Sequence, residues 1–219
     1  MITIIIIAIT SIISFMAFNN QNLLDKLIFF PPAISKRGEW YRFFTCGFIH
    51  ADMAHLFFNM FTLFIFGREI EDVFKAIFGI GLGSVLYLLL YLGALFFCLL
   101  PTYSKNSDNY YYRSLGASGA ISAVVFAYML INPMNYMGIV FIPLYMPAFL
   151  FGFIYIAISY YLDKKQAGNI NHSAHLFGGF FGLIFTFAVF ALLADINLIN
   201  EFILKVRSTP LRGLIKFGY

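Results

Sequence analysis

Residues 114–131 read SLGASGAISAVVFAYMLI, and they open an uncharged run that continues to Leu162. This run of 49 residues is too long for one membrane-spanning helix and long enough for two, since one span needs about 20 apolar residues. The segment NPMNYMG at 132–138 divides the run, because Asn-Pro and Gly interrupt helices. The stretch therefore predicts a pair of membrane helices, the first of which carries Ser118 near its start.

The composition of the whole chain agrees with a membrane protein. Hydrophobic residues make up 61% of the 219 residues and charged residues 11%, which is more apolar surface than a soluble domain of this size can bury. The net charge of +4 comes without a basic recognition motif, so we expect no nucleic-acid partner. Cys46 and Cys98 are too few for a disulfide framework and are predicted to be free, buried thiols.

Counting the uncharged runs predicts six spans, and these should be helices because lipid leaves no backbone group unpaired. The N-terminal apolar run has no Lys or Arg before it, so we expect a retained first helix rather than a cleaved signal. The predicted fold is all-α, a polytopic six-helix bundle. Its helices are expected at 2–18, 54–70, within 76–100, 116–131, from Met146 to Leu162, and 172–194.

We therefore expect a transmembrane domain over 1–195 and a basic C-terminal tail over 196–219. The tail has apolar residues at helical spacing, so either an interfacial helix or a flexible tail fits it. The first loop, 19–53, contains the apolar and aromatic segment WYRFFTCGFIH. A polar extramembrane loop would not look like this, so we expect the loop to lie partly in the membrane, with Trp40 at headgroup depth.

A few polar residues fall inside the predicted spans, where they usually need a partner or a task. His55 and Asn59 are four apart and share a helix face, whereas His50 and His55 are five apart and do not. Each polar residue also has an ordinary structural interpretation. A lone membrane serine such as Ser118 commonly bonds the carbonyl one turn earlier or packs as a small residue, and Asn59 could join two helices.

Two ridges of small residues change this balance. Gly119, Ala123 and Ala127 form one ridge, beside Ser118, and Gly116 just before it is also predicted to be a packing glycine. The other ridge contains Gly178 and Gly182, with His175 on the same face. If the ridges meet, Ser118 Oγ and a nitrogen of His175 come within hydrogen-bond reach, which gives a nucleophile and a general base.

No carboxylate lies inside a span near this pair, so the sequence predicts a Ser–His dyad rather than a triad. His55, Asn59 and the backbone N–H of Ser118 are the candidate donors to an oxyanion, because the first N–H groups of a helix are unpaired.

Three blocks of the sequence resemble the rhomboid family of intramembrane serine proteases. They are GEWYRFFTCGFIHADMAHLFFNM at 38–60, GASG at 116–119 and AHLFGGFFG at 174–182. The resemblance matches Trp40, Arg42, His50, His55 and Asn59 in the first block, Gly116, Ser118 and Gly119 in the second, and His175, Gly178 and Gly182 in the third. FGREIE at 66–71 resembles the end of the family's second helix, with Glu71 as a structural carboxylate.

The resemblance implies cleavage of the transmembrane segments of other proteins, within membrane lipid and without a cofactor or metal. Two departures stand out. The family often has an aromatic residue four positions after the nucleophile, where its ring packs on the catalytic histidine, and here that residue is Ser122. A glycine common after the helix-2 glutamate is Lys75 here. The sequence is rich in Ile, Phe and Asn, and we recognise no transit peptide in it, which favours a bacterial plasma membrane.

Two other classes of function fit parts of the sequence. A non-catalytic protein that binds or escorts membrane helices would use the same cavity without the chemistry. A transporter or metal site could be built on His50, His55, His172 and His175, but the spans offer it no carboxylate or Cys partner and no inverted repeat.

Overall fold

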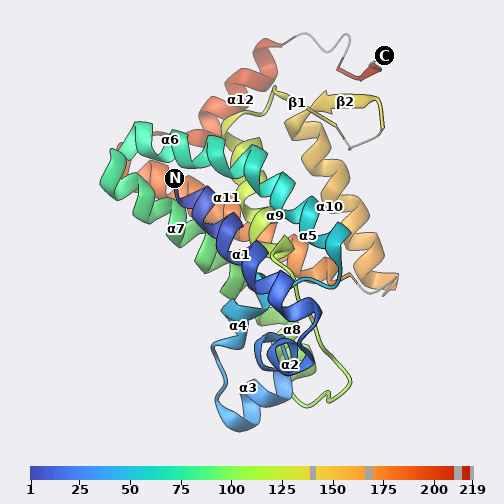
Figure 1. The fold of residues 1–219 in the computed structure, drawn as a ribbon. Coiled ribbons are helices and arrows are strands. Elements are labelled where there is room, and N and C mark those ends of the chain that lie inside the picture. The colour runs from blue at the N-terminus through green and yellow to red at the C-terminus, as the bar shows by residue number, and fades with distance from the viewer. Residues whose placement is uncertain (139–141, 166–169, 210–213, 218–219) are drawn as a thin grey trace.

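The structure is a computed structural model, and it describes residues 1–138, 142–165, 170–209 and 214–217. Most of these residues are helical, and the long helices pack side by side as a bundle (Figure 1). The helices of the bundle are α1 (Ile2–Phe18), α5 (Met53–Thr62), α6 (Arg68–Phe78), α7 (Ile80–Phe97), α9 (Ser118–Ile131), α10 (Ala148–Lys165) and α11 (His172–Ala194). A π-helical turn at Leu63–Gly67 joins α5 to α6.

The short elements gather at the two ends of the bundle. Helices α2 (Gln21–Leu27), α3 (Pro31–Arg37) and α8 (Leu100–Asn106) lie at the bottom of Figure 1, and α4 (Arg42–Thr45) and a 3₁₀ turn (Cys46–Phe48) lead from them into the bundle. Helix α12 (Leu198–Ser208) and the strands β1 (Tyr136–Gly138) and β2 (Leu144–Pro147) lie at the opposite end. Strand β3 (Lys216–Phe217) completes the set.

The helix bounds differ from the predicted spans in informative ways. Among the described residues, two helices are long and apolar enough to cross a membrane, Ile80–Asn106 and His172–Ala194. A third is added if Arg42–Phe48 and Met53–Phe78, which meet at 99°, count as one broken span. Helices α1 and α9 are apolar but have only 17 and 14 residues. The predicted second span ends at residue 70, whereas the helical segment continues through the charged residues of α6 to Phe78.

The all-α prediction is wrong at one end of the bundle. Strands β1, β2 and β3 form a small antiparallel sheet in that order, in which Met137 pairs with Met146 and Tyr145 with Lys216. Pro133, Pro143 and Pro147 interrupt any helix in this region. The backbone between α9 and α10 therefore pairs with itself and with the chain end. Of the predicted tail, 210–213 and 218–219 lie outside the described residues.

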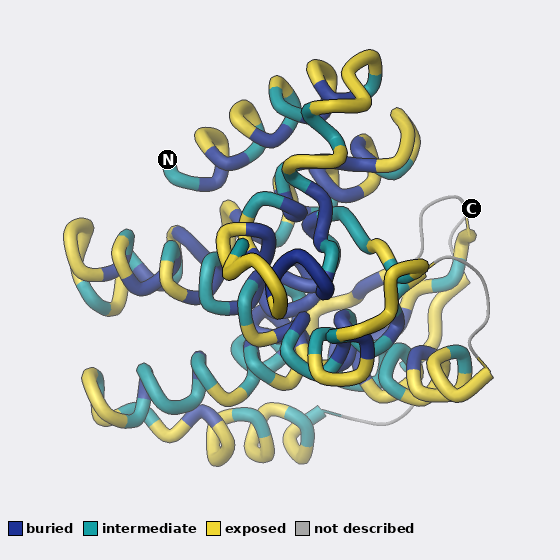
Figure 2. The backbone as a smooth tube through the Cα atoms, turned by 90° about the horizontal axis from the view of Figure 1, so that it is seen from below, coloured by how far each residue is buried: buried dark blue, intermediate teal, exposed yellow. Residues whose placement is uncertain are grey.

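The outer surfaces of the helices are apolar. Figure 2 shows that the residues turned outward are exposed and that the buried ones face the centre of the bundle. On α1, Ile5 and Ile12 are more than half exposed, whereas Thr3, Thr10 and Ser14 on the opposite face are fully buried. Such a reversed pattern suits a helix whose outer neighbour is lipid and whose inner neighbours are polar groups.

Glu71 supplies the polar partner at the start of α1. Its carboxylate is fully buried and accepts hydrogen bonds from Ile2 N, Thr3 N and Thr3 Oγ1 at 2.7–2.9 Å. These bonds satisfy first-turn N–H groups that a helix otherwise leaves unpaired. Lys75, the departure noted in the sequence, forms an ion pair with the same carboxylate. Glu71 therefore fastens α1 to α6, far from Ser118.

Arg42 organises the first loop from within. The side chain is buried, and its Nη1 donates to the carbonyl oxygens of Asp25 and Ile28, both at 2.8 Å. Its Nε forms an ion pair with Glu39, which also accepts a hydrogen bond from Arg37. The ring of Trp40 stacks on Phe43 at 5.7 Å. The sequence predicts an apolar loop here, and the structure adds that short helices, tied to Arg42, make up most of it.

Helices α9 and α11 approach more closely than any side chain would permit. A Cβ atom added to Gly178 would lie 2.0 Å from the carbonyl oxygen of Gly119, and one added to Gly182 would lie 2.2 Å from that of Ala123. Cys98, free and buried as predicted, covers the other side of Gly119. The two ridges of small residues thus meet backbone to backbone.

This contact predicts the effect of one added methyl group. Gly182→Ala should lower the free energy of unfolding by about 1–3 kcal/mol, because the obstructing atom is backbone and the two helices must move apart. Gly81→Ala is the matched control, since nothing lies within 4 Å of its added Cβ. Thermal unfolding in detergent would measure both variants, and equal melting temperatures would contradict the close contact.

The first loop also predicts a pH dependence. The hydrogen bond from Arg37, aided by Arg42, lowers the pKa of Glu39 from its ordinary 4.5 to about 2. A depressed carboxyl pKa stabilises the fold fully above pH 4.5, and this contribution is lost as the pH falls towards 2.

Glu39→Gln should therefore unfold at a lower temperature than the wild type at pH 7, by a difference equivalent to about 1–2 kcal/mol. The difference should shrink when melting is measured at pH 3. A gap that stays constant between pH 7 and pH 3 would show that the charge of Glu39 contributes nothing.

Candidate active site

Ser118 is the first residue of α9, and the first loop holds the turn that precedes it. Phe29 and Ser114 exchange two backbone hydrogen bonds of 3.0 and 3.1 Å, as an isolated antiparallel bridge. Gly116 N donates to the carbonyl of Cys46 at 2.9 Å. Segments of the first loop thus fix the backbone on the N-terminal side of Ser118, so the position of the serine depends on residues about 70–90 positions earlier.

Gly116 has a conformational reason to be glycine. Its φ of +109° lies in a region that side chains rarely adopt, and an added Cβ would stand 2.8 Å from Cε1 of His55. The sequence predicts a packing glycine at this position. The structure shows a turn glycine whose missing side chain leaves room for the imidazole of His55 beside the start of α9.

His50 lies at the centre of a buried polar chain. Ser14 Oγ donates its single hydrogen to the carbonyl of Phe48 at 2.9 Å, so His50 Nδ1, also 2.9 Å from Ser14 Oγ, must be the donor in that pair. The other ring nitrogen, Nε2, is then free to accept the N–H of Ala117 at 3.5 Å. His50 is therefore held in its neutral form, with one tautomer, between α1 and the turn before Ser118.

His50 and His55 are closer than helical spacing predicts. The expectation that they lie on different helix faces fails because α5 begins only at Met53, after Asp52 accepts a hydrogen bond from His55 N at 2.7 Å. His50 belongs to the preceding loop, which turns back so that the two rings meet edge to face at 4.9 Å.

Two side chains of α5 face the turn before Ser118 with hydrogen-bond donors. His55 Nδ1 accepts the N–H of Ala51 at 3.4 Å, which leaves the hydrogen on Nε2, the atom beside Gly116. Asn59 is buried, and its Nδ2 makes no hydrogen bond with any described residue. Unpaired buried donors are rare and costly, so a structure that retains one usually has a use for it.

His175 meets Ser118 across the close contact of α9 and α11. Its Nε2 lies 2.7 Å from Ser118 Oγ. The start of α11 is fixed by Asn171, whose side chain accepts the N–H of Ala174 at 3.0 Å and donates to Thr102 at 3.1 Å. Within the described ranges no ion pair includes His175. The pair has the geometry of a hydroxyl nucleophile beside an imidazole base.

An aromatic ring lies against His175, although position 122 is not aromatic. The ring belongs to Tyr155 of α10, with its centroid 6.4 Å from the imidazole and an angle of 23° between the planes. The hydroxyl of Tyr155 is 3.2 Å from Ser122 Oγ. No sequence motif points to Tyr155, because its helix has apolar residues all round.

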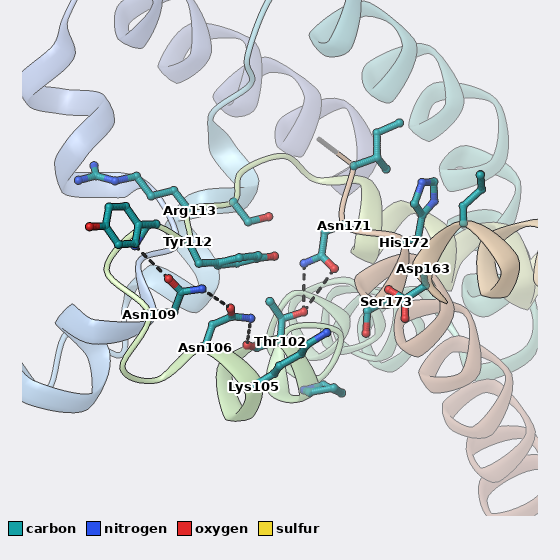
Figure 3. A pocket seen from close by; sticks show the side chains of 15 residues that line it. Thr102, Lys105, Asn106, Asn109, Tyr112, Arg113, Asp163, Asn171, His172 and Ser173 are labelled. Carbon is teal, nitrogen blue, oxygen red and sulfur yellow. Dashed lines mark hydrogen bonds between the residues drawn. The ribbon is translucent and has the colours of Figure 1, made fainter. Parts of the chain in front are cut away.

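A polar pocket of about 730 Å³ opens beside the start of α11. Its lining comes from α8, the segment before α9, the end of α10 and the start of α11. Figure 3 shows Asn171 and Thr102 joined by hydrogen bonds on its wall, with His172 near them. The ring of His172 is 6.1 Å from that of His175, so a residue of the pocket wall lies next to the Ser118–His175 pair. His172 itself is nearly buried and forms part of this wall.

The predicted site residues thus separate into two groups. Ser118, His175, His55, Asn59 and His50 converge, whereas Trp40, Arg42 and Glu71 lie in the framework. As for metal chemistry, the part of the chain that the structure describes contains no cluster of three or more His, Cys, Asp or Glu side chains placed to hold an ion.

Comparison with known proteins identifies the family of the chain. The chain is 29% identical over 152 residues to Putative rhomboid protease YdcA of Bacillus subtilis (strain 168). The match covers 68% of this chain and 67% of that protein. It is 28% identical over 175 residues to RHOMBOID-like protein 12, mitochondrial, of Arabidopsis thaliana, and here the match covers 74% of this chain and about half, 49%, of the relative. The Rhomboid domain matches residues 37–192, and since this is most of the chain, the protein belongs to the rhomboid family.

Proposed function

We propose that this protein is an intramembrane serine endopeptidase that hydrolyses peptide bonds in or near the transmembrane segments of other membrane proteins. The observation that carries the proposal is the 2.7 Å contact between Ser118 Oγ and His175 Nε2. Membership of the rhomboid family supports it, as does the amide of Asn59, which has no hydrogen-bond partner among the described residues.

The first half-reaction forms an acyl-enzyme. Ser118 Oγ attacks the carbonyl carbon of the scissile peptide bond, while its proton passes to His175 Nε2. The tetrahedral intermediate collapses, the C–N bond breaks, and His175 returns the proton to the departing amine. The contact of 2.7 Å is short enough for direct proton transfer, so no bridging group is required.

The negative oxygen of the intermediate needs preorganised donors. Nε2–H of His55 and Nδ2–H of Asn59 come from one face of α5, and the N–H of Ser118 belongs to the first turn of α9, where the helix itself provides no acceptor. A buried amide without a partner among the described residues, as at Asn59, is the state expected of a donor that bonds only when charge develops. In a site that excludes most water, such donors act strongly because little screens them.

The second half-reaction consumes water. A water molecule gives its proton to His175 and attacks the ester carbonyl, after which the bond to Ser118 Oγ breaks and the proton returns to the serine. We place the source of this water in the polar pocket lined by His172, whose ring is 6.1 Å from that of the partly buried His175. The reaction thus closes with a carboxylic acid product and the original dyad.

The proposed topology has six spans within 1–195 and an interfacial tail helix after them. Helices α1, α5 with α6, α7, α9, α10 and α11 would cross the membrane, with the shorter ones tilted less or meeting locally thinner lipid. Helix α12 has an apolar side and carries Lys205 and Arg207 in its last turn, which suits the surface of a bacterial plasma membrane. We place the protein there.

Substitution of the dyad tests the chemistry. Ser118→Ala and His175→Ala, each reconstituted in liposomes with a single-span model substrate, should lose cleavage by at least about 10³-fold, since nucleophile and base act as a unit. Product formation on gels, with the cut site identified by mass spectrometry, measures this. Cleavage that continues in Ser118→Ala would overturn the mechanism.

A serine-reactive phosphonate separates the protease from a non-catalytic helix-binding protein. It should label wild-type Ser118 and leave His175→Ala unlabelled, because a merely packed serine is not nucleophilic. Wild-type protein that binds the model substrate but neither cleaves it nor reacts would be the helix-binding protein instead.

The oxyanion donors give a graded prediction. Asn59→Ala and His55→Ala should each lower kcat by about 10²-fold or more, with a smaller change in KM, since their bonds form mainly in the transition state. Thr62→Ala, one turn further along the same helix and more exposed, is the control. If both variants turn over like the control, the oxyanion is stabilised elsewhere.

A further inference from the structure

Tyr155 contacts the proposed base without belonging to any motif. Its ring is nearly parallel to that of His175, at 23°, with the centroids 6.4 Å apart. Offset stacking of this kind is favourable at centroid distances of about 4.5–7 Å. The same ring meets Phe126 of α9 edge to face at 5.7 Å. The side chain thus touches α9 and α11, the two helices that supply the dyad.

The hydroxyl of Tyr155 completes a directed chain of hydrogen bonds. Ser122 Oγ donates its single hydrogen to the carbonyl oxygen of Ser118 at 2.9 Å. Ser122 Oγ can then only accept in its 3.2 Å contact with Tyr155, so the tyrosine hydroxyl is the donor. These hydrogen bonds run from Tyr155 through Ser122 to the backbone carbonyl of Ser118, the proposed nucleophile. The ring that lies on His175 is therefore anchored to the residue that carries the reacting hydroxyl.

His175 needs such a support because its surroundings provide no charged one. Within the described ranges His175 takes part in no ion pair, and the fixed start of α11 positions its backbone rather than its ring. A general base contributes fully only when it is held in the reactive geometry, and a displacement of about 1 Å can cost 10²-fold in rate.

We propose that Tyr155 is the positioning residue for His175, and that Ser122 in turn positions Tyr155. The inference rests on the proposed proteolytic function. The sequence resemblance leads one to expect that a single aromatic ring at position 122 would orient the histidine. Here Tyr155 of α10 provides the ring, and Ser122 of α9 holds that ring in place. Tyr155 touches no reacting atom, so its loss should affect the chemical step and leave substrate binding intact.

A series of variants separates the ring from the hydroxyl. Tyr155→Leu keeps an apolar side chain but removes the ring, and should lower kcat by about 10–100-fold with KM unchanged. Tyr155→Phe keeps the ring and loses only the hydroxyl, so its kcat should fall by less than about 5-fold, as should that of Ser122→Ala. Phe153→Ala, a strongly exposed position on the same helix, is the control and should cleave like wild type.

The decisive variant moves the ring from α10 to α9. In Tyr155→Ala the space of the tyrosine is empty, and adding Ser122→Tyr would place a ring there from the neighbouring helix. The double variant should recover at least about 5-fold of the kcat lost in Tyr155→Ala, whereas Ser122→Tyr alone should be poorly active because two rings compete for one space. Recovery of kcat without an equal recovery of melting temperature is not expected if Tyr155 serves only to stabilise the fold.

The outcomes distinguish this inference from the proposed function. Wild-type protein that cleaves nothing overturns the proposed function and removes the basis of the inference. Wild-type cleavage together with a Tyr155→Leu variant of equal kcat overturns the inference alone. If Tyr155→Leu melts at a lower temperature than wild type, Tyr155→Phe and the variants with Ser122→Tyr decide the question. A kcat that follows the melting temperature throughout the series also overturns the inference.

Discussion

The contact between the backbones of α9 and α11 is the constraint on which the rest of the site depends. Glycine at 178 and 182 lets the two helices approach until one helix meets carbonyl oxygens of the other. In lipid no hydrophobic effect draws helices together, so dispersion between closely fitting backbones has to do this. The same approach brings Ser118 within 2.7 Å of His175. Packing and the proposed chemistry therefore share one cause.

The first loop is a second constraint, because it determines where α9 begins. Its residues form a bridge to Ser114, accept the N–H of Gly116 and, through His50, bond the N–H of Ala117. A loop with this task cannot be a loose polar connection. Buried Arg42 and short helices make it rigid, and its aromatic surface suits an interfacial position, which explains why the sequence reads as apolar there.

The sequence predicts what depends on spacing along one helix, and it fails where the chain turns back. The shared face of His55 and Asn59 and the ridges on α9 and α11 could be predicted because helical periodicity carries them. The meeting of His50 and His55 could not, since it results from a loop that ends at the cap formed by Asp52. The sheet is a similar case, because its strands come from a turn between two predicted helices, where β1 pairs with β2, and from β3 about 70 residues further along the chain.

A neutral dyad is the form of this chemistry that a membrane interior tolerates best. A buried carboxylate beside the histidine would have to be removed from water, at a cost of several kcal/mol unless fully paired. A serine and a neutral imidazole avoid that cost in the resting state, but they give up the charged partner that would orient the ring. Uncharged contacts must then orient the imidazole ring. In this chain an aromatic face from α10, fixed by two hydroxyl groups to the nucleophile's own carbonyl, is placed to supply that orientation.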